Sequence, residues 1–111
     1  MSFKFKINKE SIPYRTNISI LGKDYIFEFK YNSYDERVYV DLFSSNGEPI
    51  YYSEPIIYGI PLFYNKLIDE RGNKNPSYPQ AFIIPMTVDK SYKKITYKNI
   101  DEIEILVKEV E

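Results

Sequence analysis

The sequence predicts an all-β fold, a small antiparallel β-barrel or sandwich built on a β-meander with an irregular proline-rich segment. Short stretches in which apolar and polar residues alternate recur along the chain, as in FKFKI and YIFEFKY, and period two is typical of strands with one buried face. Turn residues separate these stretches at intervals of about ten residues, as in small β folds. The 111 residues fit one domain, so we expect residues 1–111 to form a single unit.

The first half of the chain predicts a series of antiparallel strands. Alternation indicates strands at 3–7, 17–21, 25–31 and 38–43, and the last three follow one another closely enough to form a meander. Turns are expected at 11–14, where Pro13 interrupts the pattern, and at 22–24, 32–37 and 44–47. The side chains expected on the buried faces are Phe3, Phe5, Ile7, Tyr25, Phe27, Phe29, Tyr31, Val38, Val40 and Leu42.

The proline-rich segment 48–64 is the least regular apolar part of the sequence. Pro49, Pro55, Gly59 and Pro61 exclude a regular helix and a long central strand, so the prediction is extended pieces with bends. Because the chain bends, the side chains of this segment cannot all point into the core. We therefore expect this segment to contact another protein. The candidate contact residues are Ile56, Tyr58, Ile60, Leu62, Phe63 and Tyr64.

The remaining third of the chain alternates between loop and strand. Residues 69–79 are polar, contain a glycine and two prolines, and are expected to form the most mobile internal loop. A strand broken by Pro85 is expected over 81–88, and an irregular stretch over 92–100. Residues 103–107 alternate and predict a closing strand, with a short helix over 101–110 as the competing interpretation.

Composition excludes most familiar catalytic chemistry. The chain has no cysteine and no histidine, so thiol nucleophiles, disulfides, imidazole bases and the usual zinc ligands are missing. The three acidic pairs, at 35–36, 69–70 and 101–102, fall in predicted turns and lack calcium-loop spacing, and solvated turns are the commoner interpretation. We therefore predict no enzyme, no catalytic residue, no metal site and no cofactor.

Charge and hydropathy argue against nucleic acids, nucleotides and membranes as partners. The net charge is -1 with both signs scattered, and the four glycines lie far apart, so neither nucleic acid nor nucleotide binding is predicted. No apolar run approaches the roughly 18 to 20 residues that cross a bilayer, so no membrane association is expected. We expect a soluble protein made in the cytoplasm. The 12 tyrosines fit a compositional bias toward AT-rich codons, and they also supply rings suited to binding surfaces.

Residues 11–64 contain several short motifs: Pro13-Tyr14, the Gly22 turn, the strand 38–43, NGEP at 46–49 and GIPL at 59–62. Together these motifs resemble those of the small plug proteins of phage tail baseplates. The chain departs from the family pattern in having no tryptophan near Val38 and no glycine before the final strand, so its last third matches weakly.

The resemblance implies a structural protein that plugs or braces the tip of the tail tube in the virion baseplate. It implies tail hub, spike or tube proteins as partners, and self-association in a symmetric ring as a further expectation. Two alternatives remain open at this point. One is a small carbohydrate-binding module that uses exposed tyrosines and the polar loop 69–79. The other is a small inhibitor or anti-defence protein that binds one host protein tightly.

Overall fold

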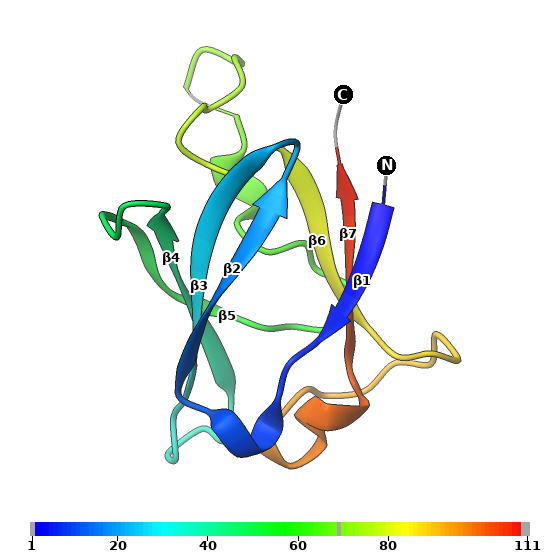
Figure 1. Cartoon of the computed structure of the whole chain (residues 1–111). Helices are drawn as coiled ribbons and strands as arrows, with labels where there is room; N and C mark the ends of the chain where they lie inside the picture. Colours follow the sequence, from blue (N-terminus) through cyan, green and yellow to red (C-terminus); the bar gives the residue numbers. More distant parts are fainter. Residues whose placement is uncertain (1, 69, 110–111) are drawn as a thin grey trace.

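The computed structural model describes residues 2–68 and 70–109, which form two antiparallel sheets packed face to face (Figure 1). One sheet has three strands in the order β1-β7-β6, and the other has four in the order β2-β3-β4-β5. The strands are β1 (Ser2–Lys6), β2 (Tyr14–Ile20), β3 (Lys23–Tyr31), β4 (Val38–Ser44), β5 (Pro49–Pro55), β6 (Ala81–Met86) and β7 (Glu104–Glu109). The all-β prediction is confirmed, and the architecture is a sandwich rather than a closed barrel.

The predicted meander forms the four-stranded sheet, and it extends one strand further than expected. β2 starts at Tyr14, three residues before the expected strand, because the interruption at Pro13 ends there. β2 and β3 are joined by a two-residue turn, Leu21 and Gly22, in which both residues have positive φ. This is the type I′ geometry that matches the twist of a hairpin, and glycine adopts it without strain. The expected turn at 22–24 is therefore displaced by one residue.

The fourth strand of this sheet comes from the proline-rich segment. β5 pairs with β4 through an irregular register that changes near Leu42, and its two prolines stand at its ends. Proline has no backbone N–H to donate. It is tolerated in β5 because β5 is an edge strand, and no further strand has to pair with its open side. Beyond Pro55 the chain leaves the sheet, and the predicted bends follow.

The three-stranded sheet joins the two ends of the chain. β1 and β6 both pair with β7, so the N-terminal strand lies beside the C-terminal one. β6 is not broken at Pro85, as was predicted, but continues to Met86, because Pro85 keeps an extended conformation opposite Ile105. The closing strand is confirmed, and the competing helix is wrong: a 3₁₀ helix ends at Glu102, before β7 begins.

The core lies between the two sheets and takes side chains from all seven strands or their immediate flanks. The expected alternation in β3 and β4 is confirmed for Tyr25, Phe27 and Phe29, which are buried. Tyr31 is 41% exposed, because it lies at the end of β3. The fully buried large side chains are Phe27, Phe29, Phe63, Ile20, Leu42, Ile56, Leu62, Ile83, Ile95, Ile100, Ile103 and Ile105.

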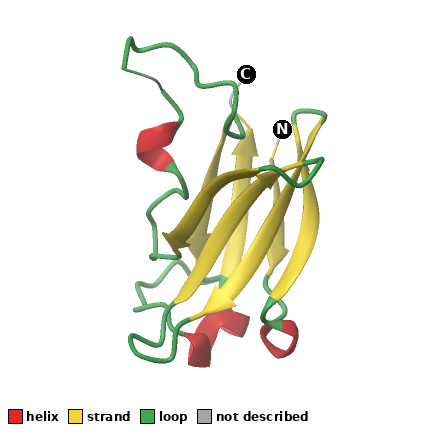
Figure 2. Cartoon of the chain, turned by 90° about the vertical axis from the view of Figure 1, so that its left-hand side faces the viewer, coloured by secondary structure: helices red, strands yellow, loops and turns green. Residues whose placement is uncertain are grey.

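In the described parts of the chain, three short 3₁₀ helices and several loops lie outside the sheets (Figure 2). The helices are η1 (Lys9–Ser11), η2 (Tyr64–Lys66) and η3 (Tyr97–Glu102). The predicted loop 69–79, described from residue 70, has no strand of its own, and an isolated bridge pairs Ile68 with Lys74. Its C-terminal end is anchored, since Tyr78 is only 8% exposed. Within the described ranges, no helix has the length and apolar character needed to cross a membrane.

Candidate protein-contact surfaces

The six predicted contact residues divide into a buried group and an accessible group. Ile56, Leu62 and Phe63 are almost fully buried and belong to the core. Tyr58 is half-buried, while Ile60 and Tyr64 are 52% and 61% exposed. The surface available to a partner in this segment is therefore formed by Tyr58, Ile60 and Tyr64.

Backbone hydrogen bonds to the edge of β6 explain this division. The N–H of Gly59 donates to the carbonyl of Pro85 at 2.8 Å, and the N–H of Leu62 donates to the carbonyl of Ile83 at 2.8 Å. Segment 59–62 therefore runs antiparallel along the edge of β6 and covers it. An edge strand that is covered in this way cannot pair with another chain.

Phe63 turns inward because of its unusual backbone. Its φ of 59° is left-handed, and its N–H donates to the Glu54 carboxylate at 2.7 Å. Its ring lies 6.3 Å from Phe27, 6.1 Å from Tyr51 and 6.1 Å from Tyr78, measured between centroids. A left-handed residue at this bend reverses the direction of the chain, so the ring enters the core and Tyr64 faces solvent.

The first accessible surface, the Tyr58 surface, consists of Tyr58, Val88 and Tyr92. The rings of Tyr58 and Tyr92 meet edge to face with centroids 5.5 Å apart. Val88 and Tyr92 are 72% and 75% exposed, although both are large and apolar. A turn holds them in place, in which Asp89 accepts hydrogen bonds from the Ser91 hydroxyl at 2.7 Å and from Thr87 at 2.8 Å.

These hydrogen bonds hold the Asp89 carboxylate against the backbone of the turn. The hydroxyl of Ser91, its backbone N–H and the Thr87 hydroxyl together lower the pKa of Asp89 from 3.8 to about 2. A carboxylate held by three donors at neutral pH fixes the backbone around it. The adjoining rings are therefore presented on a rigid support, which lowers the entropic cost of binding.

The second accessible surface, the Tyr64 groove, lies on the other side of the segment. It is a hollow of about 380 Å³ lined by Tyr64, Asn65, Leu67, Ile68, Lys74, Gln80 and Phe82. Tyr64 and Ile68 are each about 60% exposed, at 61% and 59%. The groove combines apolar walls with the amide of Gln80 and the ammonium group of Lys74, a composition suited to protein contact.

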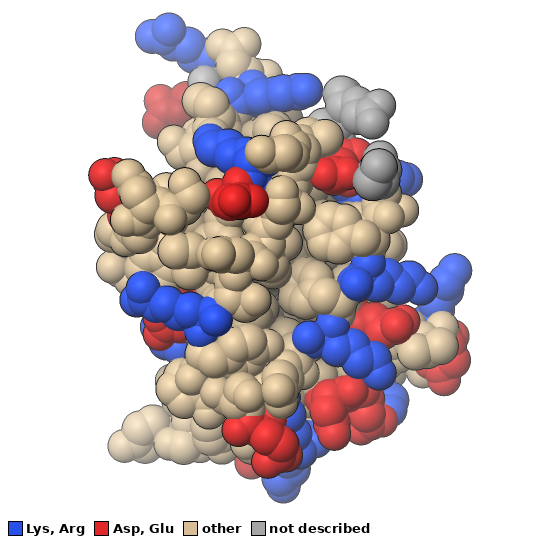
Figure 3. All heavy atoms as spheres, in the orientation of Figure 1, with Lys and Arg blue, Asp and Glu red and all other residues tan. Residues whose placement is uncertain are grey.

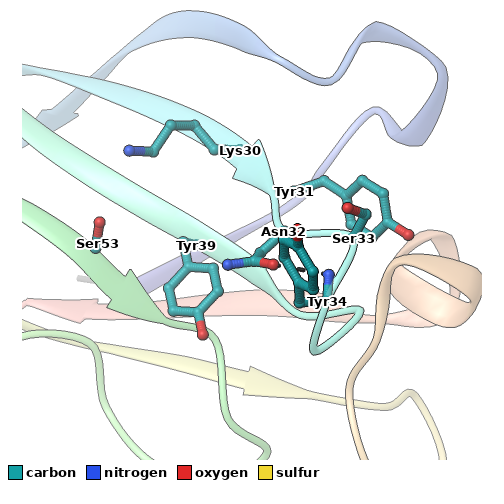
Figure 4. Close-up of a pocket in the computed structure, with 7 residues that line it drawn as sticks. All are labelled: Lys30, Tyr31, Asn32, Ser33, Tyr34, Tyr39 and Ser53. Carbon is teal, nitrogen blue, oxygen red and sulfur yellow. Dashed lines mark hydrogen bonds between the residues drawn. The ribbon is translucent and has the colours of Figure 1, made fainter.

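A third hollow, the Tyr34 hollow, lies at the end of β3 and β4 and was not predicted (Figure 4). Its volume is about 570 Å³, and it is lined by Lys30, Tyr31, Asn32, Ser33, Tyr34, Tyr39 and Ser53. Tyr34 is 98% exposed, and Tyr31 packs on Tyr97 with centroids 4.5 Å apart. Rings interspersed with Asn, Ser and Asp in a turn are the signal that could have indicated this hollow.

The carboxylate of Asp35 orders the loop beside this hollow. It accepts hydrogen bonds from the Tyr39 hydroxyl and from the Arg37 N–H. The bond from Tyr39 is the main cause that lowers the pKa of Asp35, and the same bond raises the pKa of Tyr39. Both groups keep their ordinary charges at neutral pH, so the pair positions a ring rather than transferring a proton.

The carbohydrate-binding alternative depended on tyrosines near the polar loop 69–79. The tyrosine of that loop, Tyr78, is buried against Phe63. The Tyr34 hollow lies at the opposite end of the molecule from this loop (Figures 1 and 2). Within the described ranges, no group of three or more metal-ligating side chains is found. What the three surfaces offer is rings, apolar walls and a few hydrogen-bonding groups.

These features define a class: a small β-sandwich whose accessible chemistry is suited to contact with other molecules. Residues 3–107 match the family described as the cyanophage baseplate plug of phage Pam3, gp18. The chain belongs to this family of phage baseplate plug proteins. No curated protein matches the sequence.

Family membership extends the resemblance beyond residues 11–64. The match continues through the last third of the chain as far as residue 107. The protein is accordingly a structural component of the virion tail baseplate and interacts with other baseplate or tail proteins. A structural family argues against an enzymatic function and favours the baseplate role over the two alternatives.

Proposed function

We propose that this chain plugs or braces the tip of the tail tube, acting as a single domain over residues 1–111. The observation that carries the proposal is the family match over residues 3–107. The structure supports it with two accessible apolar surfaces on either side of segment 59–62, the Tyr58 surface and the Tyr64 groove. Their partners in this proposal are the tail hub, spike or tube proteins.

The two surfaces suit a part that must fit between neighbours. Each is built on a backbone that the sandwich holds in place, by the β6 edge for segment 59–62 and by the Asp89 turn for Tyr92. Rigid aromatic anchors contribute most of the binding energy in many protein interfaces. A plug carrying two such surfaces contacts two neighbours, or two copies of one neighbour, at the same time. Self-association in a symmetric ring is a second arrangement that fits two surfaces.

The test compares three tyrosine-to-alanine variants. Tyr58→Ala and Tyr64→Ala each remove a ring from one proposed surface, and Tyr34→Ala removes the most exposed ring from outside both. Each variant is measured for melting temperature and for incorporation into assembled particles or capture by the hub protein. We expect all three to fold. Tyr58→Ala and Tyr64→Ala should lose about 1 to 3 kcal/mol of binding if each ring is an anchor.

The Tyr34→Ala result distinguishes the two proposed surfaces from the third one, the Tyr34 hollow. Tyr34→Ala tests the third surface, the Tyr34 hollow, to which the proposal assigns no neighbour, so this variant should assemble like the parent protein. If all three variants assemble normally, the contact surfaces are wrongly assigned. If the parent protein itself is not incorporated into particles, the plug function is wrong. Sedimentation of the purified chain distinguishes a ring of copies from a single copy.

A further inference from the structure

The two sheets leave an open seam between β1 and β2. Among the described residues, β1 pairs only with β7 and β2 only with β3, so both are edge strands of the sandwich. They lie next to each other and run in opposite directions (Figure 1). Together they line a groove of about 310 Å³, formed by Phe3, Phe5, Lys6, Tyr14, Thr16, Asn17, Ile18 and Ser19. We call this groove the β1–β2 seam.

The walls of the seam are apolar and incompletely covered. Phe3 and Phe5 face inward from β1, and Tyr14 and Thr16 face inward from β2, yet all four are only half-buried. Phe29 forms the floor, with its ring centroid 6.4 Å from that of Phe5 and 5.3 Å from that of Tyr14. The core is therefore accessible along this line, whereas Ile18 and Ile20 further along β2 are buried.

Hydrogen bonds near both ends of the seam tie the two sheets together. At one end the N–H of Asn8 donates to the Tyr14 hydroxyl at 2.9 Å. At the other end the N–H of Leu21, in the β2–β3 turn, donates to the Glu109 carboxylate at 2.5 Å. The groove is preformed, so a ligand would not have to separate the sheets.

The residues that line the seam carry one charge, the positive charge of Lys6. β1 and β2 carry Lys4, Lys6 and Arg15 and no acidic residue. Lys4 and Arg15 each face a carboxylate on the neighbouring strand, at 3.9 Å from Glu104 and 2.5 Å from Glu28, whereas Lys6 has no ion-pair partner among the described residues. An uncharged band lies along the same face, with Lys and Arg side chains on both of its sides and some carboxylates beside them (Figure 3).

We propose that the β1–β2 seam receives an extended, acidic segment of another protein by β-strand addition. In this mode an added strand satisfies the unpaired N–H and C=O groups of an exposed edge, and alternate side chains provide specificity. Apolar side chains of the segment would cover Phe3, Phe5 and Tyr14. Its acidic side chains would point outward beside Lys6. Because β1 and β2 run in opposite directions, the segment lies parallel to one wall and antiparallel to the other.

Lysines on an edge strand also prevent unwanted pairing, which is the competing explanation. The two explanations differ in what the edge does with an acidic partner. If the lysines only protect the edge, an acidic strand should bind no better than a basic one, and the order of its residues should not matter. A binding seam selects both the charge and the alternation, because the apolar residues must face Phe29 while the acidic ones face solvent.

The test uses the purified full chain and three eight-residue peptides. The first alternates valine and aspartate, the second alternates valine and lysine, and the third has four valines followed by four aspartates. We expect the first to bind at least tenfold more tightly than the other two. Backbone amides of 2–6 and 14–20 should show NMR shift changes and slower hydrogen exchange when this peptide is bound.

Three variants locate the binding. Lys6→Glu changes one wall, Asn17→Asp changes the other, and each should weaken binding of the acidic peptide about fivefold. Lys108→Glu makes the same charge change as Lys6→Glu on the outer face of the central strand β7 and should leave binding within twofold. If Lys6→Glu does not fold, because it faces Glu104 across the ladder, Asn17→Asp still decides the result.

Several outcomes would overturn the proposal. Equal affinity for the three peptides would leave the lysines as edge protection, and NMR changes confined to other strands would place binding elsewhere. A dimer of the chain alone that occupies β1 and β2 would make the seam a contact between copies. The partner's identity as a baseplate protein rests on the proposed function, but this assay uses no particles. Its failure is therefore distinct from failure of the tyrosine variants to affect assembly.

Discussion

The carboxylate of Asp41 accepts a hydrogen bond from the backbone N–H of Ser53 at 2.8 Å and forms an ion pair with Lys30 at 2.8 Å. Between the pairs Val40–Glu54 and Leu42–Tyr51, the single residue Asp41 lies opposite Tyr52 and Ser53. This is a β-bulge, and its extra residue, Ser53, has a φ of 62°. The Asp41 carboxylate thus accepts the hydrogen bond from the Ser53 N–H, which has lost its backbone partner at the bulge.

Replacing Asp41 with alanine should destabilise the fold. Asp41 is only 4% exposed, so its loss leaves the Ser53 N–H without its acceptor and Lys30 without its counter-charge. Lys30 is partly exposed and can regain water, which limits the cost. We expect the free energy of unfolding to fall by about 1 to 3 kcal/mol, measured by urea denaturation.

Two further variants separate the hydrogen bond from the charge. Asp41→Asn keeps an oxygen that can accept from Ser53 and removes only the ion pair, so its loss should be smaller. Lys30→Gln should cost less than about 1 kcal/mol, as is typical of partly exposed pairs. An Asp41→Ala variant as stable as the parent would show that the carboxylate does not stabilise the bulge.

The neighbouring residues Ile60 and Leu62 should respond very differently to truncation. Leu62 is 1% exposed and Ile60 is 52% exposed, although only Pro61 separates them. Leu62→Ala leaves a cavity beside Phe63 and should cost about 2 to 5 kcal/mol. Ile60→Ala removes few contacts and should cost less than about 1 kcal/mol. Thermal or urea unfolding checks both, and equal losses would contradict the division of segment 56–64 into core and surface.

Strands could be predicted from the sequence where one face of the sheet is buried and the other is exposed. Tyr25, Phe27 and Phe29 recur at every second position because the sheet has an inner and an outer face, and the pattern is local. The same reasoning could not place Tyr31, because its exposure depends on where the opposite sheet ends. Nor could it show that β6 continues through Pro85, since that depends on the pairing of Pro85 with Ile105.

The contact surfaces were less predictable because they depend on long-range geometry. The bent segment 56–64 has no hydrophobic period, so its composition indicated a contact role without deciding which side chains face outward. That decision follows from hydrogen bonds to β6, more than 20 residues away along the chain, and from the left-handed backbone of Phe63. Tyr92 joins Tyr58 only because the Asp89 turn returns the chain to this point.

Limited proteolysis should cut the polar loop first, and within a narrow part of it. The second half of the loop is anchored, since the N–H of Asn75 donates to the Leu67 carbonyl at 2.8 Å and Gln80 donates to the Asn75 carbonyl at 2.8 Å. Tyr78 is buried at its end. Trypsin should therefore cleave after Arg71 or Lys74, in the exposed stretch 70–74, before any other site. Mass spectrometry of early fragments identifies the first cut.

A first cut in another place would change the interpretation of the fold. Early cleavage after Lys30 or Arg37 would mean that the meander 25–43 opens more easily than the loop. The sandwich described above would then not be the most stable part of the molecule. As a matched control, Lys74→Gln should remove one of the two expected fragments and leave the other.

Asp89 should make the stability depend on pH in an acidic window. Its pKa is about 2 in the folded protein and 3.8 in the absence of its hydrogen bonds, so the folded state favours the charged form. The resulting stabilisation is complete above about pH 4 and is lost as the pH falls toward 2. The melting temperature of Asp89→Ala should lie below that of the parent at pH 7, and the difference should shrink between pH 4 and pH 2.

Two variants test whether this pH dependence belongs to the turn. Ser91→Ala removes the hydroxyl that contributes most to the shift in pKa, so it should reproduce part of the effect in the same pH window. Asp24→Ala removes an exposed carboxylate from outside the turn and serves as the control for the loss of one negative charge. The pH-dependent component should be larger for Asp89→Ala than for Ser91→Ala. A constant difference between parent and Asp89→Ala down to pH 2 would mean that the carboxylate acts only as a turn residue and that its charge does not stabilise the support of Tyr92.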